Sequence, residues 1–516
     1  MPLPQLLQSL LRPEVYPNSA QPVQLVETHI SWVLLTGDFV YKIKKPMNLG
    51  FLDFTSLNAR RHFCREELRL NRRLAPQLYL DLVSIGGTPA HPTLGGSTPV
   101  IEYAVKMRQF DRNAEFDRLA SNRQLNPNHI DRLAQTIADF HLAANRMTKS
   151  NPDRIANRIE QLALENFIEL SQFEKPPETV KPLARLREWT EQKFFQCKAS
   201  IKQRSESGFI RECHGDLHLG NIVVIDGQPI PFDCIEFNEN LRWIDVIDEI
   251  AFLLMDLRAH DLQGYGYRLL NRYLQITGDY KALPLLDYYQ VYRAIVRAKV
   301  ALLARDPIGG DRIENDSITH TFENYIAVAQ ASIVQNPPVL MITHGLSGSG
   351  KSTIASQIAE NLPAIQLRSD IERKRLAETD ELQSQDLYGE RANSITYCHL
   401  AETAAVLLES GYTVIVDATF LKQNWRDQFR LLADKSKSHF LILDMRAPQQ
   451  ELRNRIVERL RAENDPSDAD LEVLEIQTKH RDPLTLSEKN NSLSVETMGE
   501  IDLSALIRQI ITRRDR

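Results

Sequence analysis

The sequence has no apolar run long enough to cross a lipid bilayer, which argues against a membrane-spanning protein. Its first residues, MPLPQLLQSLLRPEVYPNSAQP, lack the basic start and the long apolar core of a secretory signal peptide. Cysteine is scarce: the five cysteines are scattered, odd in number and without C-x-x-C spacing. This usage predicts reduced thiols in a cytoplasmic protein rather than disulfides or a zinc site. The five are Cys64, Cys197, Cys213, Cys234 and Cys398.

An excess of positive charge is missing as well. The chain has 62 lysine and arginine residues against 68 aspartate and glutamate residues, which gives a net charge of −6. No global basic field therefore favours nucleic acid as a partner. The hydrophobic fraction of 42% is ordinary for a globular protein, and the length of 516 residues predicts about three domain-sized units.

The most specific pattern in the chain lies at residues 345–352, GLSGSGKS, which fits G-x-x-x-x-G-K-S/T. Glycines at this spacing let successive backbone N–H groups point at phosphate oxygens, while Lys351 reaches the outer phosphates and Ser352 offers its hydroxyl to Mg²⁺. Residues 339–343 read as a buried strand and 352–360 as a helix, which is the context that the pattern requires. The nucleotide-binding candidates are Gly345, Ser347, Gly348, Ser349, Gly350, Lys351, Ser352 and Thr353.

Three further apolar strands follow, at 364–367, 412–416 and 439–443, with helical segments between them. Alternating strands and helices predict a parallel sheet that binds ligands at the carboxyl ends of its strands. Asp417 at one strand end is expected to orient the Mg²⁺ ion held by Ser352. Asp370 at another is expected to deprotonate an acceptor hydroxyl, unless it only caps the following helix.

A helix predicted at 451–462 carries four arginines and suggests a lid over the phosphates, at about residues 446–468. The planar guanidinium group binds phosphate oxygens in pairs, which suits this role. We take Arg455 and Arg459 as the catalytic candidates, with a solvated helix face as the alternative. Residues 464–468, NDPSD, are the expected hinge of the lid.

A second set of polar residues lies near the start of the chain. Two strands are predicted at 31–35 and 39–44, joined by a tight hairpin, and Lys42 and Lys44 share one face of the second. A helix predicted at 56–74 carries two adjacent carboxylates at its middle. Lys42 is the candidate for the ATP phosphates and Glu67 the candidate partner that holds it, while Lys44 and Glu66 remain alternatives.

A helical region then follows, interrupted at residues 211–233 by a loop, a strand, a turn and a second strand. The loop contains His214-x-Asp216-x-x-x-x-Asn221, and Asp233 ends the second strand. Phosphoryl transfer needs a carboxylate beside the attacking hydroxyl and two oxygen ligands that hold Mg²⁺ on the phosphates. Asp216 is the candidate base, and Asn221 and Asp233 are the candidate metal ligands. The alternative is that these side chains only cap backbone groups.

The His-Gly-Asp loop, the asparagine five residues after the aspartate and the aspartate of the second strand together resemble the aminoglycoside phosphotransferase family. The resemblance covers about residues 23–330. It implies an α+β, bilobal, protein-kinase-like fold with an N-lobe at about 23–107, a C-lobe at about 108–335 and a hinge near 107–110 that contacts adenine. One departure is that residues 26–30, VETHI, contain no glycine, so the expected phosphate-covering loop is not of the G-x-G-x-x-G type.

The second half resembles small P-loop kinases of the polynucleotide-kinase, gluconate-kinase and zeta-toxin type. The resemblance spans about 338–516 and rests on the P-loop, on Ser369-Asp370 with Arg373, on 416–420 and on the arginine-rich helix. It implies an α/β three-layer fold with a parallel sheet. Asn336-Pro337-Pro338 marks the predicted boundary between domains at 1–335 and 336–516. The whole chain is similar to bacterial bifunctional aminoglycoside phosphotransferase/ATP-binding proteins.

The leading hypothesis is an enzyme with two sites that transfer the γ-phosphate of ATP, with Mg²⁺, to hydroxyl groups of small molecules. A second hypothesis is that one domain is an active kinase and the other an ATP sensor that regulates it. A third is a nucleic-acid 5′-hydroxyl kinase working through the P-loop half, which the acidic balance disfavours. No membrane partner is expected, and the sequence leaves the acceptors and the oligomeric state open.

Overall fold

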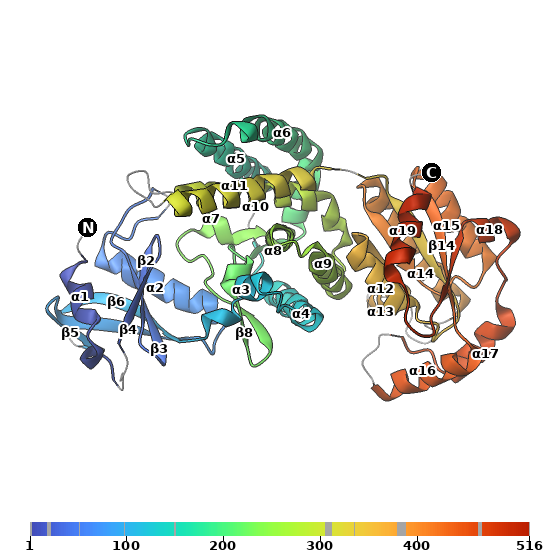
Figure 1. Cartoon of the computed structure of the whole chain (residues 1–516), viewed down its shortest axis with the longest axis horizontal. Coiled ribbons are helices and arrows are strands. Elements are labelled where there is room, and N and C mark those ends of the chain that lie inside the picture. Colours follow the sequence, from blue (N-terminus) through green and yellow to red (C-terminus); the bar gives the residue numbers. More distant parts are fainter. Residues whose placement is uncertain are drawn as a thin grey trace. The chain divides into compact units, whose positions relative to one another are not determined.

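The computed structural model describes residues 3–17, 22–50, 52–96, 99–148, 151–304, 312–334, 336–378, 389–462 and 467–514 of the chain (Figure 1). Two compact units form. Unit 1 consists of Met1–Leu162 and Lys198–Asp256, and unit 2 of Ala163–Cys197 and Leu257–Arg516. The boundaries between these units differ from the expected domain boundary at 335/336. That domain boundary stays a prediction. Three helices have residues in both units: α5 (Pro152–Ser171), α6 (Pro177–Glu206) and α8 (Val246–Ala259).

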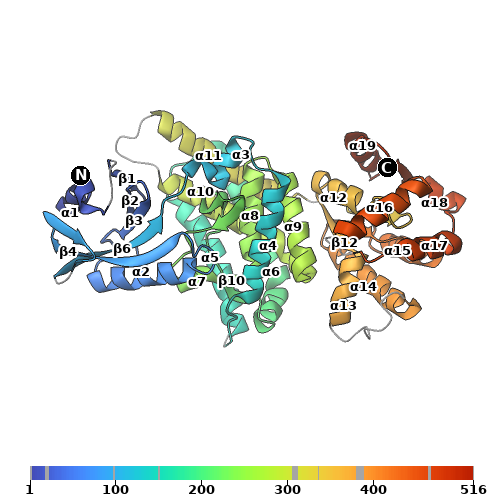
Figure 2. The same ribbon diagram turned by 90° about the horizontal axis from the view of Figure 1, so that it is seen from below.

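Unit 1 contains an antiparallel six-stranded sheet in the order β1-β2-β3-β6-β4-β5. Helix α2 (Leu57–Asn71) lies along one face of this sheet (Figure 2). Its first turn is capped by the side chain of Ser56, which accepts the N–H of Ala59. The predicted strands at 31–35 and 39–44 form as expected. The six strands are β1 (Gln24–Glu27), β2 (Ser31–Leu35), β3 (Phe39–Lys44), β4 (Tyr79–Thr88), β5 (His91–Leu94) and β6 (Val100–Arg108).

The remaining elements of unit 1 are helix α1, which packs on the six-stranded sheet, and a group of helices with two short strand pairs. Strands β7 and β10 are antiparallel, and β8 and β9 form a hairpin that helix α4 contacts. These pairs frame the loop with the candidate catalytic residues, so they determine where the loop lies. The elements are α1 (Gln5–Leu10), α3 (Phe116–Ser121), α4 (Pro127–Ala143), β7 (Ile210–Glu212), β8 (Ile222–Ile225), β9 (Gln228–Pro231), α7 (Glu239–Arg242) and β10 (Trp243–Asp245).

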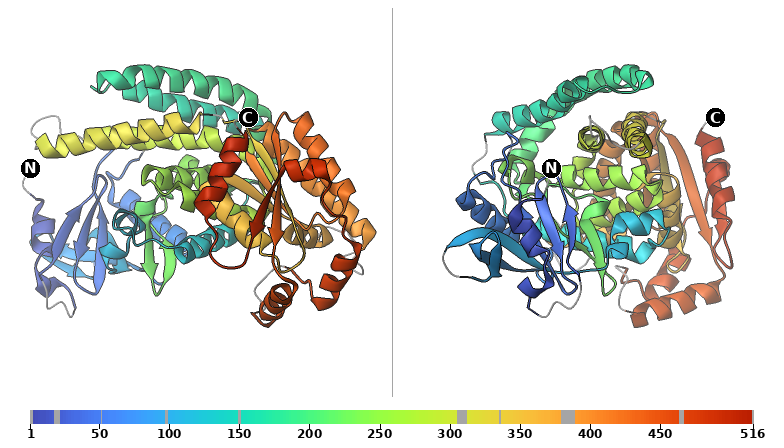
Figure 3. Two further views of the ribbon diagram at one scale, coloured as in Figure 1. Left: turned by 45° about the vertical axis from the view of Figure 1, so that its right-hand side comes forward. Right: turned by 60° about the vertical axis from the view of Figure 1, so that its left-hand side comes forward.

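Unit 2 contains a fully parallel five-stranded sheet in the order β12-β13-β11-β14-β15. Its central strands are continuous apolar runs because helices cover both of their faces. Helices α12 and α19 pack with the sheet in one apolar core, and α14 and α15 also contact its strands (Figure 3). The predicted parallel α/β sheet is thus confirmed. Its strands are β11 (Val339–His344), β12 (Ala364–Arg368), β13 (Thr413–Asp417), β14 (His439–Arg446) and β15 (Ser492–Glu496).

The helices of unit 2 include several that precede the P-loop in sequence. In the ranges that the structure describes, none of them is both long enough and apolar enough for a bilayer span. They are α9 (Gln263–Thr277), α10 (Leu286–Leu303), α11 (Arg312–Ser332), α12 (Lys351–Asn361), α13 (Ser369–Glu378), α14 (Glu390–Glu409), α15 (Gln423–Lys435), α16 (Gln449–Ala462), α17 (Leu471–His480), α18 (Leu486–Asn490) and α19 (Leu503–Arg514).

Asp287, in the first turn of α10, is a half-buried residue of unit 2. Burial raises the pKa of this group from 3.8 to about 6, although Lys193, Arg258 and a hydrogen bond with Tyr412 act in the opposite direction. The folded protein therefore binds this proton more tightly than the unfolded chain does. It follows that ionisation of Asp287 opposes folding.

We expect Asp287→Asn to raise the free energy of unfolding near neutral pH by at most about 3 kcal/mol, because each pKa unit corresponds to roughly 1.4 kcal/mol. The stabilising neutral form is fully present below pH 3.8 and is lost as the pH rises through about 6. Denaturant unfolding of both proteins on either side of this window measures the effect. The gain must be larger on the alkaline side, and an equal gain at both pH values would contradict the assignment.

Candidate active sites

Strand β3 directs two lysines at one carboxylate of helix α2. Lys42 Nζ lies 2.9 Å from Glu67 Oε1 and 2.5 Å from Asp233 Oδ1. Lys44 Nζ lies 2.7 Å from Glu67 Oε2 and also pairs with Glu236. The Lys44 side chain is fully buried, whereas that of Lys42 is 12% exposed and reaches a candidate metal ligand. This geometry favours Lys42 over Lys44 for the phosphates.

Glu67 remains ionised between these lysines. Burial by itself would raise the pKa of Glu67, but the two ammonium groups lower it to about 2. Glu66 faces away, because its carboxylate lies 2.8 Å from Arg69 and 3.9 Å from Arg242. The geometry therefore favours Glu67 over Glu66 as the partner of Lys42.

The candidate base and the first candidate metal ligand come from one loop. Asn221 Nδ2 donates to the backbone oxygen of Asp216 at 2.9 Å and to its Oδ2 at 3.1 Å, so the two side chains are held together. The side chain of Asp216 is 39% exposed and that of Asp233 is 41% exposed, so both carboxylates remain accessible. Oxygen donors of this kind suit Mg²⁺.

Glu249 on α8 binds the backbone of this loop, and the sequence analysis did not identify this residue. Its two carboxylate oxygens accept the N–H groups of His214 at 3.2 Å and Gly215 at 2.7 Å. Burial would raise the pKa of Glu249, but His141 at 3.0 Å, His214 and the Gly215 N–H lower it to about 2. His141, Cys213 and Glu249 also cluster like metal ligands, but the Glu249 oxygens already accept these N–H groups.

Gly215 takes the place of the arginine in the His-Arg-Asp pattern of protein kinases, for a steric reason. Its φ angle is +89°, and a Cβ atom there would lie 2.7 Å from the backbone oxygen of Leu241. Only glycine fits this conformation without strain or displacement of the neighbouring chain.

We expect Gly215→Ala to lower the free energy of unfolding by about 1–3 kcal/mol, through left-handed strain and the contact with Leu241. Gly50→Ala is the matched control, because Gly50 also has a positive φ of +81° but nothing within 4 Å of its Cβ position. Thermal unfolding measures both. An equal loss in the two variants would show that the contact with Leu241 contributes nothing.

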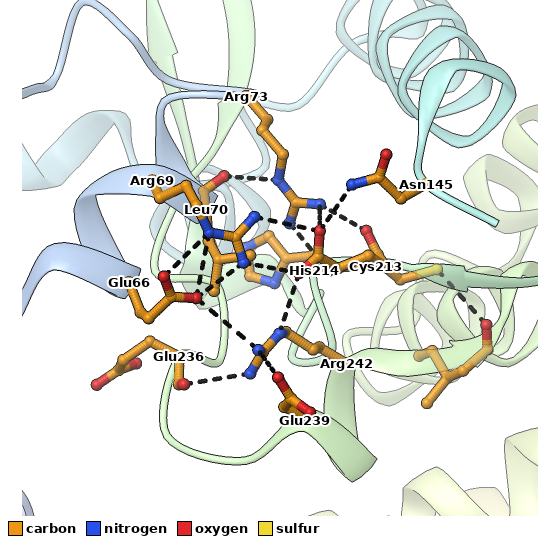
Figure 4. Close-up of polar contacts among 12 residues, drawn as sticks. Glu66, Arg69, Leu70, Arg73, Asn145, Cys213, His214, Glu236, Glu239 and Arg242 are labelled. Carbon is orange, nitrogen blue, oxygen red and sulfur yellow. Dashed lines mark hydrogen bonds and ion pairs between the residues drawn. The ribbon is translucent and has the colours of Figure 1, made fainter. Parts of the chain in front are cut away.

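A cluster of charged residues joins helix α2 to the strand that precedes the loop (Figure 4). Glu212, at the end of β7, accepts from Arg69 Nη2 at 2.8 Å, and Arg73 Nη1 donates to its backbone oxygen at 2.6 Å. Arg242 Nε lies 3.4 Å from the same carboxylate. Burial by itself would raise the pKa of Glu212, but Arg69, Arg73 and Asn145 lower it to about 2. The cluster fixes the helix that carries Glu67 relative to the loop that carries Asp216.

The connection between β1 and β2 is a tight turn, which the sequence analysis did not predict. The Thr28 N–H donates to the Ser31 oxygen at 2.9 Å, and Thr28 Oγ1 accepts the Ser31 N–H at 3.0 Å. Lys45 holds the turn through Glu27 at 2.7 Å. This short, closed turn differs from the glycine-rich loop that covers the phosphates in protein kinases.

Apolar side chains line the expected adenine region. Met107 and Phe110, in the predicted hinge, belong to the same apolar cluster as Val40 and Val223. The ring of Phe110 also meets that of Phe232 edge to face, with 5.1 Å between the centroids. The flat apolar faces suit a heteroaromatic base.

In unit 2, the P-loop lies between β11 and α12 as predicted. Gly348 and Gly350 both have a φ angle of +81°. A Cβ atom at Gly348 would lie 2.7 Å from the backbone oxygen of Leu452, so the close turn requires glycine. Lys351 Nζ donates to the Leu346 oxygen at 2.8 Å, which places the ammonium group across the mouth of the loop. The loop thus fits a polyphosphate.

The candidate Mg²⁺ ligands of this half lie together. Asp417 is buried at the end of β13 and hydrogen-bonds with the Ser352 side chain. Burial raises the pKa of Asp417, and Arg368, Ser352 and Lys351 only partly offset this. A buried carboxylate beside a hydroxyl suits a divalent cation. Burial and the nearby Arg459 lower the pKa of Lys351, although Asp417 and Asp370 act in the opposite direction. A bound anion would offset the cost of burying this positive charge.

A cavity of about 520 Å³ adjoins the P-loop, and Lys351, Asp370 and Asp417 line it. Asp370 lies within the first turn of α13, which begins at Ser369, rather than at its N-cap. The lining residues outside the segments named in the sequence analysis are Asn393, Tyr397, Leu421, Lys422, Ala469, Val473, Ile476, Gln477 and His480.

The two lid arginines have different partners. Arg455 donates to Thr497 Oγ1 at 3.0 Å and to its backbone oxygen at 2.7 Å, so it holds the loop after β15. Arg459 lowers the pKa of Lys351, and its buried Nε has no hydrogen-bond partner among the described residues. Arg455 Nη1 also donates to the P-loop oxygen of Gly348 at 3.4 Å, and Arg459 Nη2 donates to the Ala469 oxygen. Both arginines line the cavity beside the P-loop. Of the predicted hinge, residues 464–466 lie outside the described part of the chain.

Two family models match the chain, one in each half. The family described as "Phosphotransferase enzyme family" matches residues 63–286, and the family described as "AAA domain" matches residues 340–484. The uncharacterized protein Rv2004c of Mycobacterium tuberculosis is 29% identical over 460 residues, which cover 88% of this chain and 89% of that protein. The same figures hold for the uncharacterized protein Mb2027c of Mycobacterium bovis.

Among solved structures, the amicoumacin kinase hAmiN in complex with AMP-PNP, Ca2+ and Ami is similar at a TM-score of 0.38 and 14% identity. The match covers 62% of this chain and 92% of that one. Families of these two types use ATP, typically with Mg²⁺. The chain therefore combines a domain of the phosphotransferase enzyme family with a P-loop kinase-like domain, which carries a parallel sheet.

Proposed function

We propose that the chain is an ATP- and Mg²⁺-dependent phosphotransferase with two active sites, each acting on a hydroxyl group of a small molecule. One observation carries the proposal: each half brings a lysine, a carboxylate for the metal ion and a second carboxylate to one place. In unit 1 these are Lys42, Asp233 and Asp216. Lys42 pairs with Asp233, and the N–H of the preceding residue, Phe232, donates to the backbone oxygen of Asn221, whose side chain bonds to Asp216. In unit 2 they are Lys351, Asp417 and Asp370.

In the N-terminal site, Mg²⁺ bound to ATP would neutralise charge that develops on the transferring phosphate. Asn221 and Asp233 are the residues that would hold the ion. Lys42, kept in place by Glu67, binds phosphate oxygens. Asp216 accepts the proton of the attacking hydroxyl, while Glu249 fixes the backbone of its loop.

In the C-terminal site, the P-loop N–H groups and Lys351 bind the phosphates, and Ser352 and Asp417 are the residues that would hold Mg²⁺. Asp370 accepts the hydroxyl proton of the acceptor. Arg459 stabilises negative charge on the phosphate as it is transferred. A cavity of about 520 Å³ suits small ligands.

The acceptors in this proposal are small-molecule hydroxyl compounds rather than nucleic acid or a membrane, because the chain carries net negative charge. The five cysteines are free, which supports a cytoplasmic setting. The sensor alternative for the N-terminal half has one observation in its favour, the closed turn at Thr28 and Ser31 in place of a glycine-rich loop. Against it, a pure sensor has no use for the accessible Asp216.

Transfer of labelled γ-phosphate from ATP into a bacterial metabolite extract tests the proposal. Wild type, Asp216→Asn and Lys351→Ala are compared, and each labelled product is separated by chromatography. We expect at least two products, of which each variant loses a different one. A product lost in both variants would indicate sequential sites. An extract without labelled products, despite bound ATP, would favour the sensor alternative.

A further inference from the structure

Strand β12 is an edge of the P-loop sheet, and an amide side chain of α9 covers its open side. Asn271 Oδ1 accepts the N–H of Gln366 at 2.7 Å, and Asn271 Nδ2 donates to the Ala364 oxygen at 2.9 Å. One side chain thus makes both bonds that a further strand would make. Asn271 and Gln366 are 6% and 1% exposed, so water does not compete for these bonds.

Helix α9 is continuous in sequence with the first half of the chain. It lies within residues 263–277, inside the stretch that the phosphotransferase family matches, yet it belongs to the same compact unit as the P-loop sheet. Further contacts hold this region to the P-loop fold. Arg268 Nη1 lies 2.7 Å from Glu360 Oε1, Arg375 Nη2 donates to the Gln275 oxygen at 2.7 Å, and the Tyr412 hydroxyl donates to the Leu283 oxygen at 3.1 Å.

The side chain of Gln366 extends from this edge to the candidate metal ligands. Its Nε2 donates to Asp417 Oδ2 at 3.0 Å and lies 3.4 Å from the backbone oxygen of Ser352. Its Oε1 accepts the hydroxyl of Ser356 at 2.9 Å. Gln366 therefore joins Asp417 to the first two turns of α12, which begins with Lys351 and Ser352.

We propose that Gln366 is a positioning residue that fixes Asp417 relative to Ser352, and that Asn271 sets the position of Gln366. Helix α9 thereby tunes the Mg²⁺ affinity of the P-loop site. The inference rests on the proposed function of this half. Residues that hydrogen-bond to metal ligands change metal affinity by about 10–100-fold when they are removed, which gives the expected scale. A movement of α9 would change the same affinity, because the two backbone bonds of Asn271 transmit it to Gln366.

The test is the Mg²⁺ dependence of nucleotide binding at the P-loop of the full chain. Hydrogen exchange of the backbone amides at residues 348–353 is followed with AMPPNP while the Mg²⁺ concentration is varied. We expect Gln366→Leu to raise the Mg²⁺ concentration for half-protection by about tenfold, and Asn271→Ala to raise it several-fold. The protection that ADP gives without Mg²⁺ should differ less than twofold between these variants and the wild type. A general loss of structure would reduce this protection as well. Asn361→Ala, at an exposed α12 residue that bonds only locally to Gln357, is the control.

A double-mutant cycle then tests the connection itself. If Asn271 acts through Gln366, Asn271→Ala has little further effect once Gln366 is leucine. Equal shifts in both backgrounds, or no shift with Asn271→Ala, would overturn the inference. Asn271→Asp, which keeps the acceptor and removes the donor, is the second variant if the alanine protein does not fold. If AMPPNP does not protect these amides in the wild-type protein at any Mg²⁺ concentration, the proposed function of this half is overturned instead.

Discussion

We expect Asp216→Asn to lower the rate of phosphoryl transfer by the N-terminal half by about 10²–10⁴-fold, the usual contribution of a general base. The amide cannot accept the proton of the attacking hydroxyl, but it keeps the size of the side chain and can still bond with Asn221. Lys42 and Asp233 are unchanged, so ATP affinity should remain nearly the same. The rate is measured on the labelled product that this half forms.

Asp226→Asn is the matched control for this variant. Asp226 lies in the turn of the neighbouring β8–β9 hairpin with a φ of +51°, a conformation that asparagine tolerates. The Asp226→Asn variant should transfer phosphate at the wild-type rate. Unchanged transfer by Asp216→Asn itself would mean that the residue is not the base and that the kinase assignment of this half is wrong.

The second large effect is expected from Lys351→Ala, which should abolish nucleotide binding by the P-loop half. The ammonium group is the charge that the loop presents to the outer phosphates, and its position across the loop is fixed by the Leu346 oxygen. With wild-type protein, ATP and Mg²⁺ should protect the amides of residues 348–353 from hydrogen exchange. The variant should show no protection there.

The exposed Lys435, in the last turn of α15, provides the control. Lys435→Ala removes the same charge from the same half without touching the loop, so protection should match that of wild type. Retained protection in Lys351→Ala would contradict the P-loop interpretation. Protection of the N-terminal half is measured in the same experiment and should not change in either variant.

Local patterns predicted the parts of both sites that lie within one loop or at one strand end. The spacing from His214 to Asn221 and the P-loop glycines encode their own geometry, because each group forms within a few residues. Helix phase decides between adjacent carboxylates. Glu67 lies on the buried face with Cys64 and Leu68, so the apolar positions of α2 held the information that favours it.

Residues that act across the chain could not be found in this way. Glu249 and Gln366 touch their partners only because elements distant in sequence pack together. In sequence, Glu249 is one of three acids in a largely apolar helix, and Gln366 is a polar residue in a buried strand. A buried position for either residue would imply a polar partner, but the sequence does not identify that partner.

Two strand assignments were incomplete for a related reason. Strand β5 (His91–Leu94) was not predicted, and it is an edge strand that tolerates Pro92. Strand β15 (Ser492–Glu496) was not predicted, because its alternating residues carry little signal at the edge of a parallel sheet. Edge strands depend on a neighbour for their pairing, and the neighbour is known only from the fold.

The number of nucleotides that bind to one chain tests the two-site interpretation most directly, since it requires no acceptor. Equilibrium titration of the full-length protein with AMPPNP and Mg²⁺ gives this number. We expect two nucleotides per chain in the wild type and one in Lys351→Ala. A single nucleotide in the wild type, lost completely in Lys351→Ala, would contradict a nucleotide site in the N-terminal half.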